Sequence, residues 1–369
     1  MPSETFSFGR LGRPVIRELL EQREESLSPF ATRSRQSRGR ERPEEPSDLR
    51  TEFQRDRDRI IHTNAFRRLK HKTQVLIAPT GDHYVTRLTH TLEVAQIART
   101  ITRALNLSED LVEATGLGHD LGHTPFGHLG EQTLNQLYPE GFAHSAQSLR
   151  VVELLEKNGQ GLNLTWEVRQ GILFHSKPRT DLLELEKETP ALTLEAQVVR
   201  IADAVAYLSH DINDAIRAGL LTEKGLPSEV REHLGIRHSQ RINSMVWDIV
   251  EASWPASGAV ELAKGQRPSI TMSPTLRQVT NTLREFLFQR VYLPAGEGAA
   301  GQRAREVVHL LYRHLCQHPE QVPPEFFRPG ETAERAVVDY LAGMTDNFAL
   351  RTAEGIQPGI SQGVFQWLL

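Results

Sequence analysis

Apolar residues along most of this chain recur at intervals of three and four, which is the spacing of one face of an α-helix. The pattern is clearest in one stretch, at Val94, Ile97, Ala98, Ile101 and Leu105. Runs of β-branched residues are few, and aromatic residues make up only 7% of the 369-residue chain, so neither a β-sandwich nor a barrel is indicated. The sequence therefore predicts an all-α fold.

Helical patterning dominates from about residue 51 onward. A hydrophobic content of 38% is enough for one large domain or two ordinary ones. We expect further helices at about 146–157, 166–174, 194–218, 228–253, 274–290, 302–316 and 332–345. These helices divide the chain into a core at 51–225 and additional C-terminal helices at 226–369 that pack on it.

Residues 1–50 are a separate, Arg-rich segment. Five of its arginines lie close together: Arg33, Arg35, Arg38, Arg40 and Arg42. With Ser, Gln and Gly between them, this composition is typical of a flexible, solvated tail or linker, and a subunit-contact arm or an anion-binding segment are the alternatives. The formal net charge of the whole chain is -4, which argues against a surface built throughout for nucleic acid.

The N-terminal residues, the absence of long apolar runs and the single cysteine indicate the cellular compartment. The first residues, Met1-Pro2-Ser3-Glu4-Thr5, lack the basic and apolar regions of a signal peptide. No run approaches the roughly 20 apolar residues of a membrane span, so we expect a soluble, cytoplasmic protein with no membrane partner. A single cysteine, Cys316, excludes an internal disulfide framework and a thiolate metal cluster. Its helical surroundings predict an inert thiol in the core.

One glycine-rich stretch imitates a cofactor motif. Residues Gly296 to Gly301 fit the G-x-G-x-x-G pattern of a dinucleotide-binding turn. Such a turn follows a buried strand in a βαβ unit, whereas the preceding residues, Leu283 to Tyr292, have a helical pattern. We therefore interpret the stretch as a flexible loop without a cofactor role.

The most informative segment is 118–128, because it contains an adjacent His119-Asp120 pair. The pair offers an imidazole nitrogen and a carboxylate oxygen, a mixed set that hard divalent cations such as Mg²⁺ and Mn²⁺ accept. Gly116-Leu117-Gly118 is expected to end the preceding helix and to place the pair at its terminus. By itself the pair indicates little, but His90 lies about one helix upstream and Asp203 lies on a later helix.

That later helix, Glu195 to Arg217, has an acidic face. At about 100° per residue, Asp203, Tyr207 and Asp211 fall within roughly 80° of one another. Such a face looks into solvent or lines a cleft, and the tyrosine between the two acids favours the cleft.

Arg87 and His90 share a face of an earlier helix, one turn apart. The guanidinium of Arg87 would then present its forked donors to a metal-bound phosphate. For His90 taken alone, a structural histidine is the alternative.

Together these motifs resemble the HD-domain deoxynucleoside triphosphate triphosphohydrolases, in particular the bacterial dGTPase-like subgroup. The similarity runs from about residue 30 to 350. It is carried by the segments 53–62, 65–69, 87–94, 116–130, 195–203 and 339–346. The resemblance implies an HD-domain helical bundle with additional C-terminal helices.

The resemblance also implies roles for individual residues. The metal ligands would be His90, His119, Asp120 and Asp203. The catalytic residues would be His128, Glu131 and His144. The residues that bind substrate would be Gln74 at the base or sugar edge, Arg87 at the phosphates, and Tyr207 with Asp211 at the deoxyribose.

The implied reaction is hydrolysis of a deoxynucleoside triphosphate (dNTP) to deoxynucleoside and tripolyphosphate, with Mg²⁺ or Mn²⁺ as cofactor, in a homo-oligomer. Two alternatives stay open: an HD phosphohydrolase for another nucleotide, and a regulatory protein that binds single-stranded nucleic acid through its Arg-rich segment. Three positions differ from the family pattern, with Ser145 in place of Asn, Phe174 in place of Lys and Asn347 in place of Arg. The last two changes each remove a cation that could touch phosphate.

Overall fold

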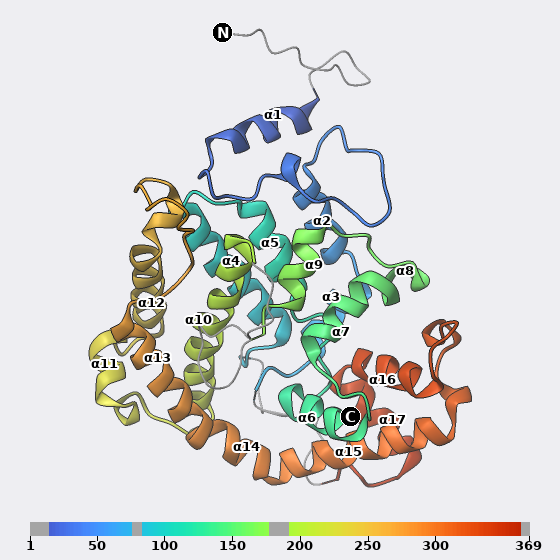
Figure 1. Cartoon of the computed structure of the whole chain (residues 1–369). Helices are drawn as coiled ribbons and strands as arrows, with labels where there is room; N and C mark the ends of the chain where they lie inside the picture. Colours follow the sequence, from blue (N-terminus) through green and yellow to red (C-terminus); the bar gives the residue numbers. More distant parts are fainter. Residues whose placement is uncertain (1–14, 76–82, 177–191, 363–369) are drawn as a thin grey trace.

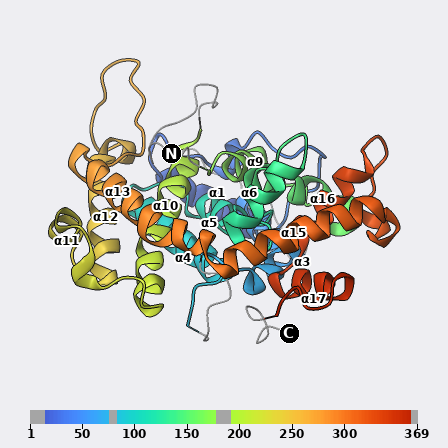
Figure 2. The ribbon, with the colours of Figure 1, turned by 90° about the horizontal axis from the view of Figure 1, so that it is seen from below.

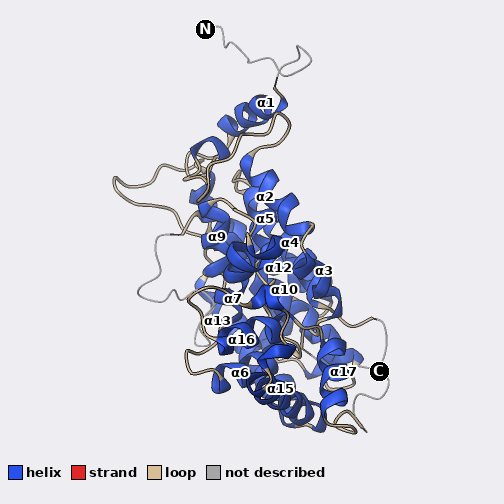
Figure 3. Ribbon diagram, turned by 90° about the vertical axis from the view of Figure 1, so that its right-hand side faces the viewer, coloured by secondary structure: helices blue, strands red, loops and turns tan. Residues whose placement is uncertain are grey.

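The computed structural model of the chain describes residues 15–75, 83–176 and 192–362, which form helices joined by loops (Figure 3). Within these ranges the only β-type pairings are two isolated bridges, Arg40 with Thr165 and Thr73 with Thr86. The predicted all-α fold is confirmed. Across the same ranges, a membrane crossing would require a longer and more apolar helix than any that is present.

The helix α10 lies between α4 and the pair of α12 and α13 (Figure 1). It packs against α4, α5 and α9, and α5 packs in turn against α2. The apolar face predicted for α4 points into this core, because its residues from Val94 to Leu105 on that face are buried. The helices of this core are α2 (Glu52–Ile61), α4 (Arg87–Ala104), α5 (Glu109–Gly118), α9 (Trp166–Leu173) and α10 (Leu194–Arg217).

Further helices precede or connect these core helices. They are α1 (Ile16–Arg23), α3 (Asn64–Arg68), α6 (Gly127–Leu137), α7 (His144–Arg150) and α8 (Glu156–Gly159). Of these, α6 and α7 follow the His119-Asp120 pair in the chain, and α7 packs against α9.

The C-terminal helices pack in two groups. One group, α11 to α13, adds its apolar residues to the cluster formed by α4 and α10. The other, α15 to α17, packs with α6 around a second apolar cluster, and α13 and α15 follow one another across the width of the molecule (Figure 2). The bounds are α11 (Ser228–Leu234), α12 (His238–Ala252), α13 (Pro274–Leu287), α14 (Leu293–Glu297), α15 (Ala299–Gln317), α16 (Ala333–Gly343) and α17 (Asp346–Ile356).

The helix predicted over 228–253 is interrupted. Gly235 has a φ of +87°, a left-handed conformation that favours glycine. The chain therefore leaves α11 at this residue and starts α12 in a new direction.

The glycine-rich stretch is not a flexible loop, and that expectation is wrong. Gly296 lies in α14, Gly298 is the N-cap of α15, and Gly301 lies in its first turn. A Cβ on Gly301 would lie 2.3 Å from the carbonyl oxygen of Gly296. Glycine thus permits the close joint between the two helices.

The expected burial of the single cysteine is also wrong, because Cys316 is exposed. The helix α15 directs Leu311 and Leu315 into the core. Cys316 stands one residue, or about 100°, further round the helix and so leaves the packed face.

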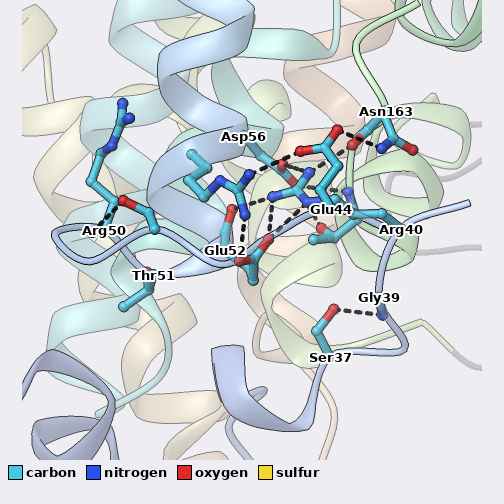
Figure 4. Close-up of polar contacts among 12 residues, drawn as sticks. Ser37, Gly39, Arg40, Glu44, Arg50, Thr51, Glu52, Asp56 and Asn163 are labelled. Atoms are coloured by element: carbon cyan, nitrogen blue, oxygen red, sulfur yellow. Dashed lines mark hydrogen bonds and ion pairs between the residues drawn. The ribbon is translucent and has the colours of Figure 1, made fainter. Parts of the chain in front are cut away.

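The Arg-rich segment differs from the expected solvated tail over its described residues, because it is bound to the core (Figure 4). The Arg40 guanidinium donates to the buried carboxylate of Asp56 and to Glu52. The same Asp56 carboxylate accepts from the backbone N–H of Thr165 at 2.8 Å and from its hydroxyl at 2.6 Å. Glu44 accepts from arginines of α2 in the same network. Buried charges need such partners, and they hold the segment in place.

We predict that Asp56→Ala lowers the free energy of unfolding by about 3–5 kcal/mol, because it removes the buried carboxylate that pairs with Arg40 and accepts from Thr165. The side chains of Arg40 and Asp56 are 5% and 0% exposed. Urea unfolding followed by circular dichroism measures the effect. Asp58→Ala on the same helix is the matched control, since Asp58 pairs with the exposed Arg50 and its loss should cost less than about 1 kcal/mol. Equal losses for the two variants would contradict the prediction.

Candidate metal and active site

Four donor side chains from three helical elements meet in the core. α4 supplies His90, the turn after α5 supplies His119 and Asp120, and α10 supplies Asp203. His90 Nε2 lies 3.2 Å from Asp203 Oδ1 and 4.0 Å from Asp120 Oδ2. His119 Nε2 lies 3.7 Å from Asp120 Oδ1 and 4.0 Å from Asp203 Oδ1. The four donor groups therefore form a closed ring in which imidazoles and carboxylates alternate.

The ring fits a divalent cation. Ligands held at about 2.1 Å from one ion are about 3–4.2 Å apart, and the ligand atoms of His90, His119 and Asp120 all lie within 4.8 Å of one another. Asp203 Oδ1 joins this group through its spacings of 3.2 Å to His90 and 4.0 Å to His119. His119 Nδ1 donates to the carbonyl of Gly116 at 2.7 Å, so its Nε2 carries the lone pair. That atom is buried and has no hydrogen-bond partner within the described part of the chain. A cation between the two carboxylates would give His119 Nε2 a partner.

A chain of buried groups behind His90 orients its ring. His90 Nδ1 lies 2.9 Å from His210 Nε2, and His210 Nδ1 lies 2.7 Å from Asp211 Oδ1. The second oxygen of Asp211 accepts from the hydroxyl of Tyr292. Burial lowers the pKa of His90 to about 4, so at neutral pH the ring is uncharged, as a metal ligand must be.

These contacts involve Asp211, the residue for which the sequence predicts a role at the deoxyribose. Its carboxylate is buried, and both of its oxygens are engaged by protein groups. The acidic face of α10 therefore points inward rather than into solvent. Tyr207, between the two acids, is half-buried and packs against the apolar cluster of α4 and α10.

The three residues expected to be catalytic lie together on α6 and α7. Glu131 Oε2 lies 3.2 Å from His128 Nδ1, and Glu131 Oε1 lies 2.7 Å from His144 Nδ1. The same Oε1 accepts from the backbone N–H of His144 at 2.8 Å. His144 Nε2 lies 3.9 Å from Asp120 Oδ1, so this group borders the metal ring. Glu131 thus joins an exposed histidine to a buried one.

Hydrogen bonding sets the charge of His144. His175 Nδ1 donates to the carbonyl of Ile172 at 2.7 Å, and burial holds the pKa of His175 well below its usual range. The neutral His175 ring therefore accepts at Nε2 from His144 Nε2, 3.0 Å away. Burial lowers the pKa of His144, but the charge of Glu131 outweighs it and raises the pKa overall. The Glu131 carboxylate therefore favours the protonated form of His144, in which both nitrogens donate.

Arg87, which the sequence predicts to contact the phosphates, pairs with a metal donor in this structure. The side chain is buried, and Nη1 donates to Asp120 Oδ2 at 2.6 Å. Nη2 contacts the backbone carbonyl of Gln74 at 3.4 Å. Two atoms here have no hydrogen-bond partner among the described residues, Arg87 Nε and Gln74 Oε1. Arg87 therefore orients Asp120, and the Gln74 amide oxygen is a buried acceptor without a partner among the described residues.

Several residues of this site were not predicted. His123 is fully buried, and its ring stacks on His144 with centroids 4.7 Å apart. His175 lies against both His119 and His144. The proximity of His123 to the His-Asp pair could have indicated it. Tyr292, 81 residues from Asp211, has no local signal.

A glycine brings the catalytic group onto the metal ring. The backbone N–H of Gly122 donates to the hydroxyl of Ser148 on α7 at 2.9 Å. A Cβ on Gly122 would lie 2.1 Å from the backbone nitrogen of Ser148. Only glycine therefore allows α7, which begins at His144, to rest on the turn that carries Asp120.

We predict that Gly122→Ala lowers stability by about 1–3 kcal/mol and displaces His144 from Glu131. Thermal unfolding measures the first effect, and the His144 ring resonances in an NMR spectrum measure the second. Gly355→Ala is the control, because that exposed position in α17 has open space for a Cβ and should gain about 0.5–1 kcal/mol. A Gly122→Ala protein as stable as the wild type would show that the two elements are not in close contact.

The comparisons with known proteins agree with this geometry. The HD domain family model matches residues 87–208, from α4 to α10, and the model of the phosphohydrolase-associated domain matches residues 270–355. These matches and the ring of histidine and aspartate donors define a metal-dependent phosphohydrolase of the HD class.

Relatives narrow the assignment. A protein of Caldanaerobacter subterraneus subsp. tengcongensis is 51% identical, over 95% of this chain and 99% of its own length. Proteins of Desulfatibacillum aliphaticivorans and Clostridium tetani are 48% and 44% identical, over 91% and 88% of this chain and 96% and 91% of their own lengths. All three are named deoxyguanosinetriphosphate triphosphohydrolase-like proteins. The chain belongs to this family, and the resemblance drawn from its motifs is confirmed.

Proposed function

We propose that this protein hydrolyses dNTPs at the α-phosphorus and releases a deoxynucleoside and tripolyphosphate. The observation that carries the proposal is the ring of four donors next to the histidines bridged by Glu131. The names of the relatives support a deoxynucleotide as the substrate.

The cofactor in this proposal is Mg²⁺ or Mn²⁺, held by His90, His119, Asp120 and Asp203. Such an ion polarises a phosphate oxygen and lowers the pKa of a bound water. Arg87 keeps Asp120 oriented through its bond to Oδ2. The His90–His210–Asp211 chain fixes the ring of His90 so that Nε2 faces the donors.

Proton transfer is assigned to His128. Its side chain is 63% exposed, so a substrate can reach it, and its contact with Glu131 leaves Nε2 free for the exchange. The His128 imidazole serves as general acid toward the leaving 5′-oxygen, or it assists the nucleophile. The His144 imidazolium borders Asp120 and can stabilise negative charge that develops on the phosphate.

The assay that tests the function is product analysis with each of the four dNTPs, in Mg²⁺ and in Mn²⁺, by phosphorus NMR. The proposal predicts tripolyphosphate as the first phosphorus product. Release of pyrophosphate together with a nucleoside monophosphate would show that the protein cleaves a different bond of the triphosphate. Hydrolysis of a monophosphate or a ribonucleotide alone would favour an HD phosphohydrolase for another nucleotide.

We predict that His119→Ala or Asp203→Ala weakens Mn²⁺ binding by at least about a hundredfold and abolishes turnover, because each removes a ligand. Isothermal titration with Mn²⁺ measures the affinity, and circular dichroism checks that the helices persist. His314→Ala is the control, since His314 lies on α15 with Gln321 as its partner. Wild-type affinity in the Asp203 variant would contradict the ligand assignment.

The sugar provides a further prediction. The Tyr207 ring would close the space next to C2′ of the sugar. A ribonucleotide would then have to bury its 2′-hydroxyl without a hydrogen-bond partner, which favours a dNTP over the matched NTP by roughly a hundredfold. Tyr207→Ala should narrow the ratio of kcat/KM between a dNTP and its matched NTP. Tyr340→Ala is the control, because Tyr340 packs on the other apolar cluster and should leave the ratio unchanged. An unchanged ratio in the Tyr207 variant would mean that this ring only packs in the core.

A further inference from the structure

A carboxylate of the C-terminal region binds the backbone of the HD core. Asp346, the first residue of α17, is 6% exposed. Its Oδ1 accepts from the backbone N–H of Phe126 at 3.0 Å. Its Oδ2 accepts from the backbone N–H of Thr73 at 3.0 Å and from the Thr73 hydroxyl. One buried side chain thus joins the start of α17 to two loops of the core.

The Phe126 backbone needs this support. Phe126 and Gly127 have φ values of +61° and +60°, a left-handed conformation that disfavours a residue with a side chain, such as phenylalanine. His128 follows at once, in the first turn of α6. By accepting from Phe126 N–H, Asp346 fixes the turn that sets the direction of His128.

Lys72 makes a second link of the same kind. Its side chain is buried, and its ammonium donates to the carbonyls of His123 and Ala342. The first carbonyl belongs to the turn before α6, and the second belongs to α16.

A third link reaches α7. Asp339 on α16 is 1% exposed and accepts from Gln147 Nε2 at 2.8 Å and from Arg150 Nε at 2.9 Å. Both donors lie on α7, the helix that begins at His144. The α16 carboxylate therefore binds two side chains of α7 and holds this helix in place.

The metal donors are held in another way. Among the described residues, neither α16 nor α17 forms a hydrogen bond to His90, His119 or Asp120. These three are oriented by His210, by the Gly116 carbonyl and by Arg87, all within the core.

We propose that α16 and α17 position the proton-transfer residues, with Asp346 holding the turn before His128 and Asp339 holding the helix that carries His144. The inference rests on the proposed function for the roles of these two histidines. Asp346 and Asp339 are positioning residues in this account, because they touch neither metal donors nor substrate.

The experiment compares the full-length variants Asp346→Asn and Asp339→Asn with the wild type. Each variant should lower kcat by at least about tenfold, because a small displacement of a catalytic group is costly. Both should leave Mn²⁺ affinity and stoichiometry as in the wild type and change KM by less than about threefold. In NMR spectra the ring signals of His128 and His144 should shift, while those of His90 and His119 stay.

Two further variants make the result specific. Asp248→Asn is the matched control, because Asp248 also accepts from a backbone N–H, that of Ser273, away from the site; its kcat should equal that of the wild type. Thr73→Val removes one donor to Asp346 while keeping the carboxylate, and it should lower kcat partially. It replaces Asp346→Asn if that protein does not fold.

A parallel loss of Mn²⁺ affinity would overturn the proposal, since it would mean that the two aspartates support the whole core. Wild-type kcat and unshifted histidine signals in the folded variants would overturn it as well. If the wild type released no tripolyphosphate, the proposed function would fail, whereas the ring signals of His128 and His144 would still test the positioning.

Discussion

The buried carboxylate of Asp120 is the point on which the rest of the structure depends. Burial raises the pKa of this carboxyl, but the neighbouring His119 and Arg87 side chains outweigh it and hold the pKa well below its usual range. An anion in a low-dielectric core is stable only where partners surround it. The Arg87 guanidinium donates to this carboxylate, and His144 Nε2 lies 3.9 Å from its other oxygen. The contacts that stabilise the Asp120 charge thus bring α4, α5 and α7 together, and they form a site for a cation.

The sequence predicted what local periodicity and spacing determine. The three-and-four pattern of α4 identified the buried face, and the 100° rule correctly placed Asp203, Tyr207 and Asp211 on one face of α10. The pairs that close over long separations could not be predicted in this way. Arg87 contacts Asp120, Tyr292 contacts Asp211, and Arg40 contacts Asp56, each because folding leaves a buried charge that needs a partner. The glycine joint at Gly301 and the exposed thiol of Cys316 likewise depend on packing that no single segment encodes.

The two halves of the site take most of their hydrogen-bond support from different parts of the chain. The metal donors take their orientation from within the core, through Gly116, Arg87 and the chain that ends at Asp211. The histidines bridged by Glu131 lie on α6 and α7, which pack against or are bonded to the C-terminal helices. A phosphohydrolase needs both a fixed cation and a proton donor at a set position.

The central claim is that His90, His119, Asp120 and Asp203 surround one divalent cation. Crystals soaked in Mn²⁺ and measured for anomalous scattering test it most directly. The account predicts one strong peak inside the ring, at about 2.1–2.3 Å from all four donor atoms. A peak between His123, His128 and Glu131 instead, or no peak at the ring in crystals of active protein, would contradict it.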